Sequence, residues 1–468
     1  MKIRRVTYLA LGAFVCAVSC SKEAAEPDVF EWADGNIYFR TSLSDLATSR
    51  AQDMTLERLE SFQVTCFNTA DSDTDPSGHL SPYFENATFI RKTNSPTVTT
   101  YVSSPAEGTR DWPANNGLLR FFAFSPSLAV MAGGSFINTS VGNGSSATVG
   151  YRLGNVRINP DISRQFDFVT AEAAGERWKD FSQGIELAFS HQLCQVELKA
   201  WGDASDYDFE IAGVRIGNPV VEGTFVFADD DTPVNAGKWA KSDKAVKDKV
   251  EYLYCSPGTS NSGELPATGD RIFRINSKEH NTPESAASIM GKGGCAMVIP
   301  TVNTAWEGTA DPNIGSVPYK TDRMYFSVLL RASQAGTPLY PYAGNPNGMT
   351  VIYYAVDREG TIISRLYPGD ENGEYFTDPD HKTPYTATDG VEVKDFGWAA
   401  ISVDADWSAG KRYVYTLNYS EGIGMHDPAD PEPGKPIVGK SSISWGVSVG
   451  SWDYATADEN YTPDVEVP

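Results

Sequence analysis

Short apolar runs separated by turn-forming residues recur along this sequence, and they leave little room for helices. The runs are rich in β-branched and aromatic residues, and clusters of Gly, Pro, Asp and Asn bound most of them, as is typical of β-strands. Examples are residues 118–124, 295–299, 324–330, 351–356 and 413–419. The best short helical candidate is residues 56–62. The pattern therefore predicts an all-β chain, most simply built from β-sandwiches.

The length of 468 residues is too great for one compact core and predicts two domains. A strand-like stretch over residues 209–216 ends in Gly217-Asn218-Pro219, and another strand-like stretch follows it. We expect the domain boundary at this break, with an N-terminal domain over residues 36–216 and a C-terminal domain over residues 217–468. The Pro-rich residues 427–436 give a weaker boundary signal and predict an extended connector.

Residues 185–198 hold two apolar sets that are out of phase with each other. The first set is Ile185, Leu187 and Phe189, and the second is Cys194, Val196 and Leu198. One regular strand cannot keep both sets on the same face, so a bulge or bend is expected near His191 and Gln192. We therefore interpret His191 as a structural residue at a kink rather than as a ligand.

The first residues of the chain predict export and lipid attachment. A basic start is followed by an apolar run over residues 6–18, which is too short to span a bilayer and has the form of a secretory signal. The run leads into Ala17-Val18-Ser19-Cys20, which resembles the lipobox of bacterial lipoproteins. Residues 1–19 are therefore expected to be a signal peptide, with Cys20 lipidated and residues 20–35 forming a tether; a plain signal peptide is the alternative. No later run resembles a membrane span, so the lipid is expected to be the only membrane attachment.

Charge and cysteine content narrow the possible partners. A formal net charge of −23 argues against nucleic acid, because the phosphates would be repelled. Beyond the leader and Cys20 the cysteines are Cys66, Cys194, Cys255 and Cys295. In an exported chain they could form two disulfides, although Cys194 and Cys295 lie in apolar runs where buried free thiols fit as well. Their pairing stays open, and their wide spacing argues against zinc.

Several motifs resemble enzyme or metal signals without the context that such chemistry needs. Residues 446–450 match G-x-S-x-G, but Ser448 is expected mid-strand, with no helix following it. Residues 71–78 resemble a calcium loop, yet Pro76 and Pro82 stand where an EF-hand needs Gly and Glu. This stretch and residues 228–233 are better explained as solvated loops. The five histidines are scattered, and although acidic residues are plentiful, nothing nominates a particular carboxylate pair for glycoside hydrolysis. We therefore expect no enzyme, no metal and no cofactor, with a surface hydrolase as the third alternative.

Strands near the two ends of the chain alternate strictly between apolar and polar residues. In the first, over residues 36–43, one face carries Ile37, Phe39, Thr41 and Leu43. A polar loop with a single arginine, Arg50, follows over residues 44–53. In the last, over residues 443–450, one face carries Ile443, Trp445, Val447 and Val449 and is expected to be buried.

A series of characteristic segments runs along nearly the whole chain. They are "AVSC" at residues 17–20, "IYFRTSL" with "ATSRA", "SFQVTCFN", "PYFENATF" with "DWPANNGLLRFFAFSP", "IELAFSHQLCQVELKA" with "IAGVRIGNPVVEGTF", and "GWAAISVDADWSAGKRYVYTLNYSEGIG". In these segments the chain resembles the fimbrillin family, the lipoprotein subunits of type V pili from Gram-negative gut and oral anaerobes. Each segment alone is only moderately specific, whereas their order and spacing together carry the resemblance.

The resemblance implies a fold, an assembly mechanism and a location. It implies two tandem transthyretin-like β-sandwich domains in an outer-membrane, surface-exposed lipoprotein. An arginine-specific surface protease would cut between Arg50 and Ala51, release the lipid together with the first strand and leave a groove. A strand of a neighbouring fimbrial subunit, with residues 443–450 as the candidate donor, would fill the groove and build the fimbria. The adhesion ligand on a host or bacterial surface is not identified by the sequence.

Alternatives remain at each of these points. Arg40 and Arg58 are other basic positions, but Arg40 lies inside the first strand and Arg58 in the helical candidate. Residues 443–450 could instead be an ordinary edge strand of the C-terminal domain, and Arg50 an uncut loop residue. A monomeric surface lipoprotein with a glycan-binding β-sandwich is the alternative function, because ten tryptophans could supply aromatic platforms for sugars.

Overall fold

The computed structural model of the chain is almost entirely β, which confirms the predicted class. It describes residues 35–43, 54, 58–92, 99–131, 133–140, 148–203, 207–227, 238–240, 246–255, 269–308, 322–342, 348–369, 373–438 and 443–452. Helical structure in these ranges consists of α1 (Arg177–Asp180) and the 3₁₀ turns Ile162–Arg164, Pro283–Ser285 and Gly291–Gly293. No helix within them is long and apolar enough to cross a membrane.

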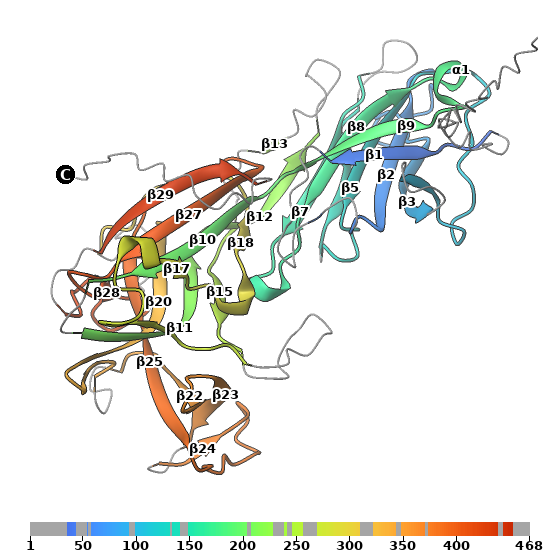
Figure 1. Cartoon of the computed structure of the whole chain (residues 1–468). Coiled ribbons are helices and arrows are strands. Elements are labelled where there is room, and N and C mark those ends of the chain that lie inside the picture. Colours follow the sequence, from blue (N-terminus) through green and yellow to red (C-terminus); the bar gives the residue numbers. More distant parts are fainter. Residues whose placement is uncertain are drawn as a thin grey trace, which may run out of the picture.

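A closed barrel occupies one end of the molecule (Figure 1). Around the ring the order is β1-β4-β3-β2-β5-β8-β9. The strands are β1 (Phe39–Leu43), β2 (Ser61–Asn68), β3 (Phe84–Lys92), β4 (Thr100–Ser103), β5 (Leu119–Ser125), β8 (Val169–Gly175) and β9 (Ile185–His191). The helix predicted for residues 56–62 is wrong in its described part. Arg58 lies in a turn, and Phe62 lies in β2, where it pairs with β3.

A second sheet packs on the outside of the barrel, in the order β13-β12-β7-β6, with β14 also on β12. Its strands are β6 (Ser135–Asn138), β7 (Tyr151–Arg157), β12 (Val220–Val226), β13 (Lys238–Trp239) and β14 (Val246–Lys247). Phe122 points outward from β5 and its ring lies 5.4 Å from the rings of both Tyr151 and Phe227. Because β7 precedes residue 217 and β12 follows it, this sheet combines strands from both sides of the predicted domain boundary. The boundary itself stays a prediction.

Two further sheets form the other end of the molecule. The smaller runs β17-β10-β27-β29, with β18 also on β10; these strands are β10 (Cys194–Trp201), β17 (Ala287–Ser288), β18 (Ala296–Val298), β27 (Lys411–Asn418) and β29 (Ser444–Ser451). The larger runs β15-β11-β20-β25-β22-β23-β24, and β22 to β24 project as an arm in Figure 1.

The strands of the larger sheet come from widely separated parts of the chain. They are β11 (Tyr207–Gly217), β15 (Val250–Leu253), β16 (Phe273–Ile275), β20 (Tyr325–Gln334), β21 (Thr337–Tyr340), β22 (Val351–Asp357), β23 (Ile362–Pro368), β24 (Tyr375–Phe376), β25 (Val391–Ser402) and β28 (Met425–His426). A short pair, β19 (Val302–Asn303) and β26 (Ala405–Asp406), stands apart from it.

The two predicted breaks between strands lie where the sequence places them. The bend at His191 and Gln192 ends β9 in the barrel, and β10 begins at Cys194 in a different sheet. The break after Gly217 is a tight turn in which Asn218 has a φ of 61°, a left-handed conformation that asparagine tolerates better than most residues.

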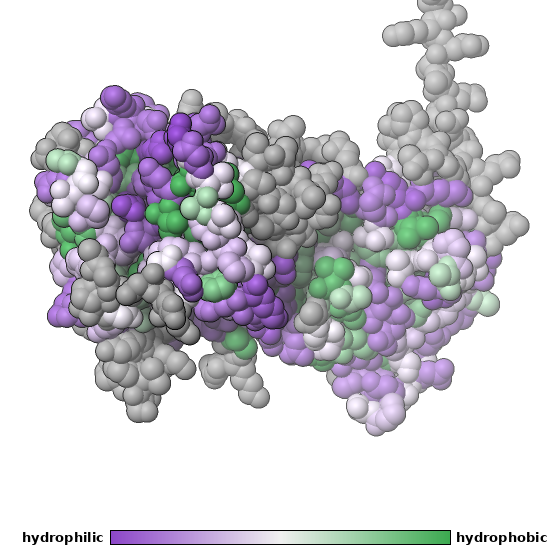
Figure 2. Space-filling model, turned by 90° about the horizontal axis from the view of Figure 1, so that it is seen from below, coloured by the Kyte–Doolittle hydropathy of each residue, from purple (hydrophilic) through white to green (hydrophobic). Residues whose placement is uncertain are grey.

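Apolar side chains fill two main cores. One lies inside the barrel, and the larger one runs from the outer face of the barrel through the remaining sheets. On the face shown in Figure 2, hydrophobic residues form small patches scattered among polar ones.

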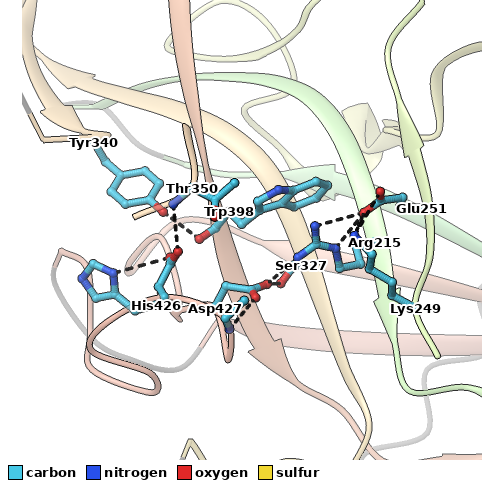
Figure 3. A network of polar contacts seen from close by, with 11 residues as sticks. Arg215, Lys249, Glu251, Ser327, Tyr340, Thr350, Trp398, His426 and Asp427 are labelled. Carbon is cyan, nitrogen blue, oxygen red and sulfur yellow. Dashed lines mark hydrogen bonds and ion pairs between the residues drawn. The ribbon is translucent and has the colours of Figure 1, made fainter. Parts of the chain in front are cut away.

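The extended connector predicted for residues 427–436 is wrong. This stretch is a folded loop after β28, closed by turns such as Asp430 N donating to the Asp427 carbonyl (2.9 Å). Asp427 and Asp430 are buried, because Asp427 pairs with Arg215 of β11 (3.3 Å) and accepts a hydrogen bond from Ser327 of β20 (Figure 3). The acidic and Pro-rich composition of this stretch predicts a solvated linker. Instead, the buried guanidinium of Arg215, from the distant strand β11, binds the loop to the larger sheet.

Candidate functional site

Strand β1 closes the barrel by filling the gap between β4 and β9. It runs parallel to β9, from Phe39 opposite Ile185 to Leu43 opposite Phe189, and antiparallel to β4, with Phe39 opposite Tyr101. Backbone bonds extend this seam beyond the strand, since Ile37 N donates to the Arg110 carbonyl at 2.6 Å. Without β1, backbone groups on both β4 and β9 would lack their partners.

Alternate side chains of this segment lie in the barrel core. Ile37 and Phe39 are fully buried, as the predicted alternation requires, and Thr41 is half-buried. The side chain of Leu43 lies outside the described part of the structure. The Phe39 ring meets three others nearly edge-on, at centroid distances of 4.7 Å to Phe89, 5.2 Å to Phe121 and 5.9 Å to Phe62. Phe39 therefore plugs an aromatic pocket, and edge-on contacts of this kind add to the stabilisation from burial.

Local features position the walls of this pocket. Gly184, just before β9, has a φ of +70°, and a Cβ added there would lie 3.3 Å from the Tyr38 carbonyl oxygen. Glycine therefore suits both the left-handed backbone and the close approach of the first strand. On the other wall, the Tyr101 hydroxyl donates to the Leu59 carbonyl at 2.5 Å. Burial raises the pKa of Tyr101, which keeps this phenol protonated as a donor.

The candidate donor strand is β29, and it is an edge strand. Its hydrogen-bonded neighbour among the described strands is β27, with Ser444 opposite Asn418 and Ser451 opposite Lys411. The buried face predicted for this stretch is correct only at its start. Ile443 is buried, Trp445 and Val447 are half-buried, and Val449 is 53% exposed because the strand runs out over the edge of the core.

Other predicted site residues either lie outside the described ranges or take ordinary positions. Cys20, Arg50, Ala51 and residues 228–233 fall outside those ranges. Ser448 is mid-strand in β29, so the G-x-S-x-G match forms no sharp turn. Residues 71–78 form an exposed loop between β2 and β3, where the Asp75 carboxylate accepts from the backbone N–H groups of Ser77 and His79. Within the described ranges no group of three or more His, Cys, Asp or Glu side chains could hold a metal ion.

The four cysteines in the described part of the structure are free thiols, so the two disulfides that they could form are not present there. Cys66, Cys194 and Cys295 are buried and Cys255 is half-buried. Burial raises the pKa of the Cys66 and Cys194 thiols well above the usual value, which makes them unreactive.

Most described tryptophans are core residues and offer no exposed platform. Five are buried, namely Trp112, Trp306, Trp398, Trp407 and Trp452. Among the described tryptophans only Trp178, in α1, is strongly exposed, at 75%.

The sequence alone did not reveal the strands that flank β1. Residues 185–189 had a recognisable alternating pattern, but nothing local in it indicated pairing with residues 39–43. Residues 100–103, which form β4, make a short segment with only Tyr101 and Val102 as large apolar residues, so their pattern does not predict a strand.

Comparison with known proteins gives one family match. A model of the fimbrillin-like family matches residues 49–290. No curated protein matches the chain. Solved structures similar to it include candidate cell adhesion proteins of Bacteroides uniformis (11% identity, 90% of this chain and 100% of that chain, TM-score 0.34) and Bacteroides ovatus (11% identity, 91% of this chain and 100% of that chain, TM-score 0.34). At these values the structural likeness carries no functional inference.

Proposed function

This chain belongs to the fimbrillin-like family, and on that premise we propose that it is a structural and adhesive subunit of a surface fimbria. In this proposal the chain is exported as a lipoprotein, anchored to the outer membrane through Cys20 and exposed at the cell surface. It has two tandem transthyretin-like domains. An arginine-specific protease cuts between Arg50 and Ala51, and donor-strand exchange with other fimbrial subunits follows. No enzymatic activity and no cofactor are proposed.

The observation that supports this proposal best is the position of β1. Strand β1 and the residues just before it close the barrel and fill its core through Ile37 and Phe39, and β1 lies between β4 and β9, whose facing edges would otherwise be unpaired. Its ladders are short and one of them is parallel, a pairing slightly weaker per residue than antiparallel pairing. Loss of this strand would leave a strand-shaped groove with an aromatic pocket in its floor, which is what a donor strand requires.

An empty groove would be costly, and this favours rapid filling. Exposing a phenylalanine pocket forfeits about 1.5–3 kcal/mol for each large apolar side chain that leaves it. Unpaired β4 and β9 edges would also invite strand addition from another molecule. A cut beside β1 would thus act as a trigger for assembly.

Strand β29 supports the donor role in part. It is eight residues long, lies at a sheet edge and contains no proline or lysine that would block pairing on its free edge. Its apolar face, with Trp445 and Val447, could enter a groove in a neighbouring subunit. Position in the fimbria and the adhesion ligand are left open by this proposal.

The alternative, a monomeric lipoprotein that binds glycans through a β-sandwich, needs exposed aromatic platforms. Among the described tryptophans only Trp178 is strongly exposed, and it lies on a single turn of helix at the barrel end. We therefore favour the fimbrial proposal.

The test is limited digestion of the chain without its leader, residues 21–468, by an arginine-specific protease. Mass spectrometry should find a product beginning at Ala51, and size-exclusion chromatography with electron microscopy should then find oligomers. Arg50→Ala should abolish both results. Arg358→Ala is the matched control, because Arg358 is 76% exposed and far from the seam, and it should change neither. If Arg50→Ala leaves processing and assembly unchanged, the proposal is wrong.

A further inference from the structure

Four residues that are far apart in the sequence meet at the end of the β1 seam: Met54, Asp167, His191 and Trp452. The Asp167 Oδ2 atom accepts a hydrogen bond from the backbone N–H of Met54 at 2.9 Å. The same oxygen lies 2.7 Å from His191 Nδ1. Both side chains are buried, so this contact is shielded from water and the Met54 backbone is held at the barrel wall.

Trp452, which follows β29 in the chain, lies over the Asp167–His191 pair. Its indole stacks on the His191 ring, with centroids 4.5 Å apart and planes within 9° of parallel. Trp452 is buried and directly follows Ser451, the last residue of β29. The backbone continues the contact, since Trp452 N donates to the Gly410 carbonyl (3.0 Å) and Gly410 N to the Leu193 carbonyl (2.9 Å).

This contact lies where the first strand ends. The last residue of β1, Leu43, is opposite Phe189, two residues before His191 in β9. Met54 is held on Asp167, which contacts His191 at that same end of β9. Three features are therefore neighbours: the end of β1, the Asp167 side chain that anchors Met54, and the end of β29.

We propose that Trp452 is a latch through which β29, in its own subunit, stabilises the Asp167–His191 anchor of Met54. While β29 lies on β27, the indole keeps water from the buried pair and the seam stays closed. When β29 leaves to occupy a neighbouring subunit, Trp452 leaves with it and the anchor is exposed. A subunit that has donated its strand thereby becomes easier to open at its own β1. This inference rests on the proposed function, because it assigns a consequence to strand donation.

Trp452 acts through His191 and is a positioning residue, so the test must separate its effect from general loosening of β29. The variant is Trp452→Ala in the uncleaved chain, and the matched control is Val449→Ala, which truncates an exposed side chain of the same strand. Peptide-resolved hydrogen–deuterium exchange should find the Met54 amide exchanging at least tenfold faster in Trp452→Ala. It should find wild-type exchange at Met54 in Val449→Ala and wild-type exchange at β3 in both.

Three further variants keep the result decisive. Trp452→Phe retains a stacking ring and should keep exchange at Met54 slow, whereas Trp452→Leu should not. His191→Phe should release Met54 while Trp452 is still present. If β3 also exchanges fast in Trp452→Ala, that variant is unfolded, and the comparison of Trp452→Phe with Trp452→Leu decides.

The latch proposal is wrong if exchange at Met54 is equal in Trp452→Ala and Val449→Ala. It is also wrong if exchange at Met54 is equal in Trp452→Phe and Trp452→Leu. Because this measurement uses uncleaved protein, it is independent of whether Arg50 is ever cut. Failure of digestion in the wild type would count against the proposed function alone. If cleavage does occur, Trp452→Ala should be cut several-fold faster than Val449→Ala.

Discussion

Arg215 shows how single residues fix long-range structure in this chain. Its guanidinium stacks over the Trp398 ring at 4.0 Å and pairs with Asp427 and Glu251. Burial alone would lower the pKa of Arg215, but the charges of Asp427 and Glu251 outweigh burial and raise it. A permanently charged Arg215 thus ties the folded loop after β28 to the larger sheet.

Glu251 makes part of this attachment dependent on pH. Burial by itself would raise its pKa, but Arg215 and, to a smaller degree, Lys249 lower it below the ordinary value of 4.5. A group whose pKa is lowered by folding stabilises the protein above its unfolded pKa, and this contribution is lost as the pH falls through the folded value. Glu251→Gln should therefore lower the free energy of unfolding by about 1 kcal/mol at pH 7.

The difference between Glu251→Gln and wild type should shrink as the pH falls below about 4.5. Urea unfolding at pH 7 and pH 3.5 measures it. Glu359→Gln, an exposed carboxylate in the turn between β22 and β23, is the control and should change stability little at either pH. A Glu251→Gln difference that is constant with pH would show that the charge of Glu251 is not what matters.

At the scale of elements, β1 is distinguished by how it is held. One aromatic side chain, Phe39, and two short ladders join it to the barrel. A peptide covering residues 36–43 should therefore rebind a barrel that has been cut after Arg50 and has lost its first strand. The Phe39→Ala peptide should bind about a hundredfold more weakly, since removing a buried phenyl ring costs at least about 3 kcal/mol.

Fluorescence anisotropy of a labelled peptide measures this binding. An Arg40→Ala peptide is the control, because Arg40 points away from Phe39 in the alternation and should affect affinity less. Equal binding of the Phe39→Ala and wild-type peptides would mean that the groove does not recognise the strand through its aromatic pocket.

The sequence was informative about elements wherever local pattern decides the structure. Alternation predicted the burial of Ile37 and Phe39, and phase and turn residues located the breaks at His191 and Gly217. Prediction from the sequence failed where a contact with a residue far away along the chain determines the structure. Residues 427–436 have the composition of a linker, but Arg215 buries Asp427. Likewise, no periodicity within residues 39–43 could reveal that β9 lies beside them, so the closed seam could not be predicted.

At the scale of the whole molecule, the barrel is not an independent unit. Phe122 faces outward from β5 into the large core, where it meets Tyr151 of the second sheet, and Phe227 from beyond residue 217. Since the two ends share this core, the chain over residues 21–468 is expected to unfold in one cooperative transition. Phe122→Ala should lower the free energy of unfolding of the whole chain by about 3–5 kcal/mol.

Differential scanning calorimetry checks this prediction. Phe122→Ala should move a single transition to lower temperature, and Val302→Ala, which removes a strongly exposed side chain, should leave it in place. Two separate transitions, of which only one moves, would mean that the barrel unfolds independently.

The pairing of β1 with β9 also has a consequence in time. The first of the described strands to be synthesised is one of the last that can be placed, because Phe39 lies opposite Ile185 and must wait for nearly the whole barrel to be synthesised. Pairings this distant along the chain form slowly, since the entropy of closing the intervening loop is lost before the contacts form. Seam closure is thus expected to be the late step of barrel folding. A newly made chain would then pass through the same open-ringed shape that processing is proposed to recreate, so folding and the proposed assembly would share an intermediate.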